Sequence, residues 1–211
     1  STRPGSRGVS ATEELRRVLP VIEGIRQHSD APISIDTTKS AVYAAAVEAG
    51  ADMLNDISGL TRDPDIVQRL RHLRTPVIIM HSKGTPDVMQ RDPRYDDLFG
   101  EIDGFLRRQA DVALEAGASA VIVDPGVGFG KTLEHNLQLI THLERFAEIG
   151  HPVLIGPSRK SFIAKALGLE ADERLEATLA AVSISVLNGA DIVRVHDVRE
   201  CRRAADMAAA F

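Results

Sequence analysis

The chain has 211 residues with a formal net charge of −5, and 44% of its residues are hydrophobic while only 4% are aromatic, so we expect one globular domain with an aliphatic core. The acidic balance argues against a nucleic-acid or membrane-surface protein, and no apolar run approaches the ~18 residues of a membrane span. A single cysteine, Cys201, excludes an internal disulfide framework, and without a recognisable signal peptide we expect a cytoplasmic protein.

Short aliphatic runs alternate with longer helical patterns along the whole sequence. After an amphipathic helix near 11–28, the predicted strands are 32–36, 52–55, 76–80, 120–123, 152–156 and 191–195. The helices that follow them are predicted near 39–49, 64–73, 95–115, 133–146, 161–167, 172–187 and 199–209. This unbroken alternation predicts a parallel sheet with right-handed crossovers, and no linker or low-complexity tract divides it.

Polar or ionisable residues stand at or just after the C-terminal end of every predicted strand. They are Asp36, Asn55, Asp56, His81, Asp124, Ser158, Arg159, Lys160, Arg194 and His196. An open doubly wound sheet gathers its ligand groups near one switch point, whereas a barrel brings all strand ends to one mouth. We therefore expect an α/β TIM barrel in which residues 1–211 form a single domain with about six of the eight βα units, strands 3 to 8. The first two units are then absent from this sequence.

A glycine-rich segment runs from Asp124 to Thr132. Its ending, Gly130-Lys131-Thr132, is typical of a phosphate-binding P-loop, but Pro125 stands where that motif requires its first glycine. We therefore expect a βα loop that closes over a ligand, with Phe129 as a stacking wall. A plain flexible loop is the alternative interpretation.

Two groups of residues suit an anion. Lys160 and Ser161 stand where a strand ends and a helix begins, and the free N–H groups of a helix N-terminus favour an anion or a carboxylate. Arg194 and His196 are two residues apart in an extended segment, so their side chains share one side and suit a phosphate or pyrophosphate. Side chains that merely face solvent are the alternative for both.

Three further residues supply hydrogen-bond acceptors. Asp36, Asn55 and Asp124 accept hydrogen bonds, and Asn55 can also donate. Such a set can accept hydrogen bonds from the donor groups along one edge of a planar heterocycle. A metal site is the rival interpretation, but too few carboxylates cluster along the sequence and His81 stands alone.

Seven segments occur in the order and approximate spacing of one known family. They are Ser1-Thr-Arg-Pro-Gly5, Ile35-Asp36-Thr37, Asn55-Asp56-Ile57-Ser58-Gly59, Met80-His81, Asp124 to Lys131, Ser158-Arg-Lys-Ser161 and Arg194-Val-His196-Asp197. On these segments the chain resembles the dihydropteroate synthases, the target class of sulfonamide drugs. The resemblance implies a barrel enzyme of folate biosynthesis. It would condense 6-hydroxymethyl-7,8-dihydropterin diphosphate with 4-aminobenzoate to give 7,8-dihydropteroate and pyrophosphate.

The resemblance also implies a role for each matching residue. The pterin ring would be held by Asp36, Asn55, Asp124 and Lys160, and the diphosphate by Arg194 and His196. Of these, the catalytic residues would be Asp36, Asp124, Lys160, Arg194 and His196. Thr2 and Arg3 would lie in a loop over the aminobenzoate, and Phe129 and Ser161 would contact its ring and its carboxylate.

The resemblance is incomplete at the front of the chain. The family binds Mg²⁺ with an asparagine in a loop after its first strand, and this sequence has no counterpart of that loop. We therefore expect Mg²⁺ as the cofactor but no metal ligand within these residues. The resemblance further implies a homodimer acting on small molecules, with no nucleic-acid or membrane partner.

Two other functions stay open at this point. A pterin-binding barrel that transfers a methyl group from methyltetrahydrofolate to a corrinoid partner would share the Asp/Asn platform. It would not need residues 158–161 together with 194–196. A pterin-binding barrel without turnover is the second alternative.

Overall fold

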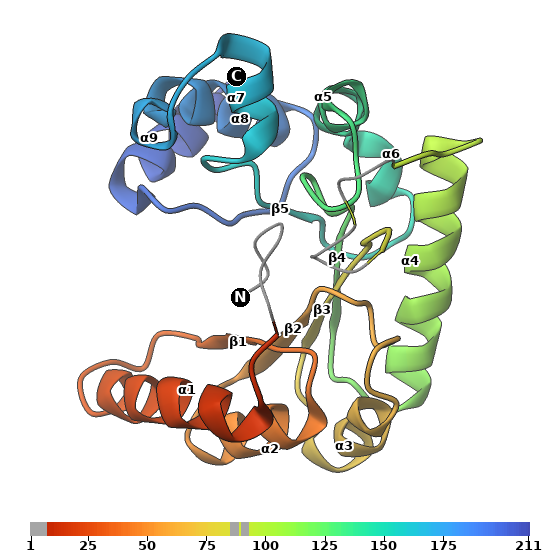
Figure 1. Ribbon diagram of the computed structural model, residues 1–211, viewed down its shortest axis with the longest axis vertical. Helices are drawn as coiled ribbons and strands as arrows, with labels where there is room; N and C mark the ends of the chain where they lie inside the picture. Colours follow the sequence, from red (N-terminus) through yellow and green to blue (C-terminus); the bar gives the residue numbers. More distant parts are fainter. Residues whose placement is uncertain (1–7, 85–88, 90–92) are drawn as a thin grey trace.

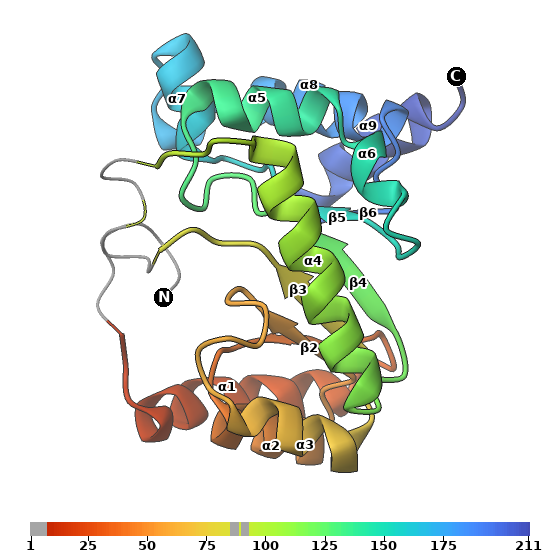
Figure 2. The ribbon, with the colours of Figure 1, turned by 90° about the vertical axis from the view of Figure 1, so that its right-hand side faces the viewer.

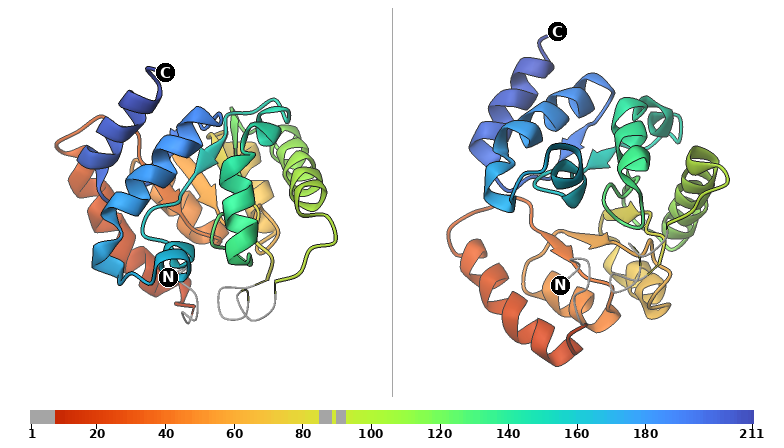
Figure 3. Two further views of the ribbon diagram at one scale, coloured as in Figure 1. Left: turned by 90° about the horizontal axis from the view of Figure 1, so that it is seen from above. Right: turned by 45° about the horizontal axis from the view of Figure 1, so that its top comes forward.

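The computed structural model describes residues 8–84, 89 and 93–211. Its strands are β1 Ser34–Asp36, β2 Met53–Asp56, β3 Val77–Met80, β4 Val121–Asp124, β5 Leu154–Ile155 and β6 Ile192–Val193. Its helices are α1 Ala11–Arg26, α2 Ser40–Glu48, α3 Asp65–Leu73, α4 Leu98–Glu115, α5 Leu133–Thr141, α6 Glu144–Ala147, α7 Ser161–Leu167, the 3₁₀ helix η1 Ala171–Glu173, α8 Leu175–Leu187 and α9 Val198–Ala208. The helices surround the strands (Figures 1 and 3). Thr2 and Arg3 lie outside the described residues.

The strands pair in parallel and in chain order. β1, β2, β3 and β4 form one sheet, β5 and β6 form a second, and an isolated parallel bridge between Val123 and Val153 connects them. An open doubly wound sheet reverses its strand order at a switch point, and the described strands show no reversal. The strands therefore form an arc of a barrel, with every C-terminal end at the same edge.

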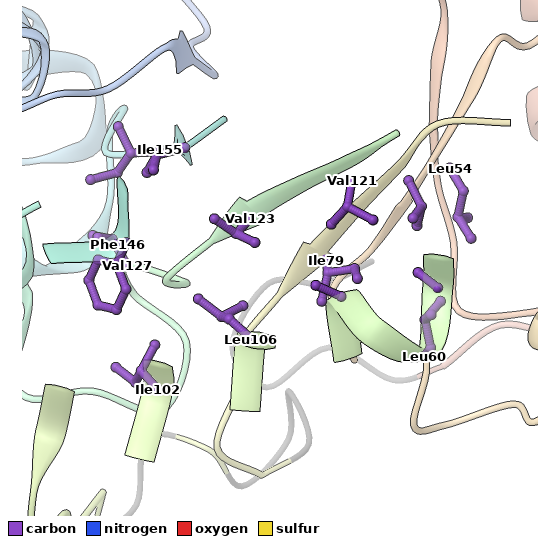
Figure 4. Packing of buried hydrophobic residues seen from close by; sticks show 14 of the residues in the cluster. Leu54, Leu60, Ile79, Ile102, Leu106, Val121, Val123, Val127, Phe146 and Ile155 are labelled. Carbon is purple, nitrogen blue, oxygen red and sulfur yellow. The ribbon is translucent and has the colours of Figure 1, made fainter. Parts of the chain in front are cut away.

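The core lies between the strands and the outer helices and is aliphatic, as predicted. α4 runs along β3 and β4 (Figure 2), and its Ile102 and Leu106 are fully buried against strand residues such as Ile79 and Val123 (Figure 4). All four residues of β3 are buried, which is typical of a parallel strand covered on both faces. This packing fixes the strand ends that carry the polar residues.

Three predicted helix boundaries are wrong. The helix expected over 133–146 is two helices, because His142 has a non-helical conformation (φ −120°, ψ 40°) between α5 and α6. The helix expected from residue 95 begins at Leu98, because the side chain of Asp97 accepts a hydrogen bond from the backbone of Gly100 and caps it. The helix expected from 172 opens as η1 before α8.

The two end strands of the arc have no strand partner on their outer edges within the described residues. Ile192 of β6 is 37% exposed there. That two more βα units would pair with the outer edges of β1 and β6 stays a prediction. Across the part of the chain that the structure describes, no helix has the length and apolarity needed to cross a membrane.

Candidate active site

Side chains from distant parts of the chain meet at the C-terminal edge of the strands. Arg194, just after β6, donates from Nη2 to Oδ2 of Asp36, at the end of β1, over 3.2 Å. Asn55 lies opposite Asp36 in the register of β1 and β2. Burial raises the pKa of both Asp36 and Asp124, and the positive charges of Lys160 and Arg194 oppose this rise. The structure thus brings these five residues to one mouth.

Asp36 offers an unused acceptor to that mouth. Its Oδ1 is buried and has no hydrogen-bond partner among the described residues. Burial raises the pKa of Asp36 above its ordinary value, and the charge of Arg194 opposes this rise. The neighbouring Asn55 side chain is also buried. A buried oxygen without a partner is costly, so a ligand N–H that reaches it gains a hydrogen bond.

Asp124 is buried at the end of β4 and is fixed by the glycine-rich loop. Its Oδ1 accepts a hydrogen bond of 2.7 Å from the backbone N–H of Gly126. Burial raises its pKa, while that hydrogen bond and the charge of Lys160 oppose the rise. Gly126 has φ +74°, and a Cβ there would lie 1.9 Å from the carbonyl oxygen of His81. Only glycine allows the loop to approach β3 so closely.

Lys160 connects this loop to the start of α7. Its Nζ donates to the carbonyl of Val127 over 2.8 Å and lies 4.1 Å from the ring centroid of Phe129. Burial lowers the pKa of Lys160 to about 8, while the charge of Asp124 opposes the change. The ammonium therefore stacks on Phe129 by a cation–π contact beside the two carboxylates.

Lys131 is buried in the protein interior, which the sequence did not indicate. The side chain is only 1% exposed, and its Nζ lies 3.0 Å from the carbonyl oxygen of Phe129 and 3.2 Å from Nδ1 of His81. Burial lowers the pKa of Lys131 to about 7 and that of His81 to about 3, so His81 is neutral and its Nδ1 can accept. The ammonium faces the protein interior rather than a nucleotide phosphate.

The predicted anion-binding residues are more exposed. Arg194 and His196 are exposed, and Nδ1 of His196 lies 2.9 Å from Oγ of the buried Ser158. Ser161 is exposed at the first position of α7, where the helix has free N–H groups. The sequence marked Ser158 as a strand-end residue within one of the family segments, but nothing in it indicated the contact with His196.

A cavity of about 310 Å³ flanks this group of residues. It lies between α1 and the loops after β1 and β2, and its lining includes Asp36, Ile57, Arg62 and the ion pair of Glu14 with Lys39. Asn55, Asp124 and Lys160 are not among its lining residues. The mouth therefore extends sideways from Asp36 beyond the predicted site.

Within residues 8–84, 89 and 93–211, no three His, Cys, Asp or Glu side chains are grouped as metal ligands. Asp36 and Asp124 instead face the cations Lys160 and Arg194. These residues do not fit a magnesium site. Their arrangement is an acceptor-rich floor with cationic groups beside it, which suits a planar donor-bearing ring attached to an anion.

Comparisons with known proteins agree with this chemistry. The family model "Pterin binding enzyme" matches residues 1–196. A dihydropteroate synthase from Synechocystis sp. is 47% identical over 201 residues, which cover 94% of this chain and 70% of that protein.

Two solved structures are similar over the entire chain. The Yersinia pestis dihydropteroate synthase in a sulfonamide drug complex is 40% identical with a TM-score of 0.96, and 77% of that chain is covered. The Thermus thermophilus enzyme in complex with 4-aminobenzoate is also 40% identical, with a TM-score of 0.91 and 81% of its chain covered. The fold is accordingly the expected TIM barrel. The chain belongs to the pterin-binding enzymes and, among them, to the dihydropteroate synthase family.

Proposed function

We propose that this protein condenses 6-hydroxymethyl-7,8-dihydropterin diphosphate with 4-aminobenzoate, forming 7,8-dihydropteroate and pyrophosphate. As a member of its family, it is a transferase of folate biosynthesis. The observation that carries the proposal is the buried, unpartnered Oδ1 of Asp36 in a mouth that also holds Asn55 and Asp124. These acceptors complement the ring N–H and amino groups of a pterin.

The reaction replaces the C–O bond to the diphosphate with a C–N bond to the aminobenzoate nitrogen. The diphosphate leaves with the electron pair of the C–O bond, and the nitrogen gives up one proton to solvent or to the departing pyrophosphate. Electron donation from the pterin ring stabilises positive charge at the methylene carbon as the diphosphate departs. The carboxylates of Asp36 and Asp124 hold the ring and favour this charge. The aromatic amine is already nucleophilic, so its orientation contributes more than a strong base.

The leaving group departs toward Arg194 and His196. The guanidinium of Arg194 stays charged and presents a fork of donors to phosphate oxygens. His196 adds a donor on the same side of the extended segment. Lys160 beside Phe129 holds the ring, while Phe129 and Ser161 receive the ring and the carboxylate of the aminobenzoate. Thr2 and Arg3 complete the aminobenzoate site in this proposal.

Mg²⁺ would supply additional charge stabilisation at the diphosphate when bound. We derive no step through it, because the described residues present no ligand set for it. Magnesium dependence, a homodimeric assembly, a single domain over 1–211 and a cytoplasmic location stay predictions.

The direct test is turnover by the purified protein. The pterin diphosphate and 4-aminobenzoate are supplied with Mg²⁺, and dihydropteroate and pyrophosphate are quantified together. We expect equimolar products, and loss of both with Asp124→Asn. Transfer of a methyl group from methyltetrahydrofolate to a corrinoid acceptor, without dihydropteroate formation, would overturn the proposal. Pterin binding without any turnover would identify a non-catalytic barrel instead.

A further inference from the structure

Ser158 and His196 form a reciprocal pair of hydrogen bonds at the mouth. Ser158 follows β5 and is 3% exposed, whereas His196 follows β6. The backbone N–H of His196 donates to Ser158 Oγ over 3.2 Å, and the same Oγ lies 2.9 Å from His196 Nδ1. The residues that follow Ser158 and His196 are also joined, because Arg159 Nε donates to Asp197 over 2.9 Å. The imidazole is therefore held by its Nδ1 edge.

The hydrogen bond that the Ser158 hydroxyl can donate determines which tautomer the His196 ring adopts. A serine hydroxyl carries one hydrogen and accepts through its lone pairs, and one lone pair already receives the His196 N–H. Among the described residues, Nδ1 of His196 is the acceptor within reach of this hydrogen. If Nδ1 carried the proton of a neutral ring, the buried hydroxyl hydrogen would have no acceptor, which is costly. Nδ1 therefore accepts, and Nε2 carries the proton.

We propose that Ser158 is a positioning residue that fixes His196 as the neutral tautomer with its proton on Nε2. Nε2 lies on the opposite side of the ring and has no hydrogen-bond partner among the described residues. His196 can then donate to a diphosphate oxygen while uncharged, so the leaving group receives a donor without a proton first being taken up. This inference rests on the proposed function, which places the diphosphate at His196.

The first test reads the tautomer directly. The protein is labelled with ¹⁵N-histidine, and spectra are recorded at about pH 8, where an unperturbed imidazole is neutral. The His196→Gln variant identifies the His196 signals by their loss. We expect the resonance of an unprotonated nitrogen for Nδ1 and that of a protonated nitrogen for Nε2. In Ser158→Ala the two forms should mix. A proton on Nδ1 in the wild type, or an unchanged pattern in Ser158→Ala, would overturn the inference.

The second test measures binding of pyrophosphate and, separately, of a pterin without phosphate, by titration calorimetry. Ser158→Ala should weaken pyrophosphate binding about three- to tenfold, the value of one neutral hydrogen bond, and leave the pterin unaffected. Ser185→Ala is the matched control, because this buried serine donates to the carbonyl of Ala181 within α8. It should change neither affinity.

A double variant separates action through His196 from a general structural effect. Ser158→Ala should weaken pyrophosphate binding no further in a His196→Gln background. Additive losses would contradict a role exerted through His196. If the wild type does not bind pyrophosphate at all, the proposed site of the diphosphate is wrong, while the tautomer spectrum still tests the contact itself.

Discussion

Lys160 has a position that makes pterin binding sensitive to pH. Burial lowers the pKa of its ammonium to about 8, while the negative charges of Asp124 and Asp36 oppose this change. Lys160→Ala should weaken binding of a pterin without phosphate about ten- to a hundredfold near neutral pH, the cost of a lost charged hydrogen bond. As pH rises through about 8, the wild type loses this charge, so its advantage over Lys160→Ala should shrink. Titration calorimetry at several pH values checks this.

Lys165 provides the control for that experiment, because it lies on α7, which Lys160 precedes, but is exposed. Lys165→Ala should leave pterin affinity unchanged at every pH. An unchanged affinity in Lys160→Ala would mean that Lys160 supports the loop through Val127 without binding the ring.

Arg194 pairs with Asp36 and, in the proposed function, also binds the diphosphate, so its removal should affect the two parts of the substrate differently. Arg194→Ala should weaken pyrophosphate binding about ten- to a hundredfold, because a charge-assisted contact is lost. It also removes the ion pair with Asp36, but that pair has 59% of the Arg194 side chain exposed and contributes under about 1 kcal/mol. Affinity for a phosphate-free pterin should therefore fall only slightly. Equal losses for both ligands would indicate that Arg194 holds the mouth together instead of binding the anion.

At the scale of single elements, the glycine-rich loop after β4 depends on Gly126. Gly126→Ala forces a side chain into a positive φ and into the carbonyl of His81. Gly117 has φ +90° with no atom within 4 Å of its ideal Cβ, so Gly117→Ala incurs the backbone strain alone. We expect Gly117→Ala to lower the free energy of unfolding by about 1–2 kcal/mol and Gly126→Ala to lower it by more. Urea unfolding measures both.

Only Gly126→Ala should also weaken pterin binding, because the Gly126 N–H holds the carboxylate of Asp124. If both variants bind pterin equally well, the loop does not position Asp124 as the structure indicates.

The sequence predicts the elements better than the contacts between them. Strand ends such as Asp36 and Asp124 could be placed together, because parallel strands of a barrel end at one mouth. The order of strands and helices is also confirmed. The contact of Ser158 with His196 could not be predicted, because it depends on how two loops 38 residues apart approach each other. Asp97 as a helix cap was missed because several polar residues precede α4.

At the scale of the whole molecule, the burial of Lys131 links stability to pH. Lysine is rarely fully buried without a carboxylate partner, and nothing in the sequence indicated that Lys131 would be buried. Here the ammonium contacts a carbonyl oxygen and the neutral His81 instead. Its pKa falls from 10.5 to about 7, mainly through desolvation. Between those values the unfolded chain binds a proton that the folded protein does not, so stability rises with pH across that window.

Replacing Lys131 should reveal the free-energy cost of burying its charge. Below about pH 7 the folded wild type carries the buried charge at full cost, whereas Lys131→Met carries none. Relative to wild type, the free energy of unfolding of Lys131→Met should therefore be higher at about pH 6 than at about pH 9, by roughly 3 kcal/mol. Urea unfolding of both proteins at each pH gives this difference, since the titrations of groups that Lys131 does not influence cancel. Lys165→Met, at an exposed position, should show the same difference from wild type at both pH values. A difference for Lys131→Met that does not change with pH would mean that the lysine keeps its proton throughout, held by the field of Asp124.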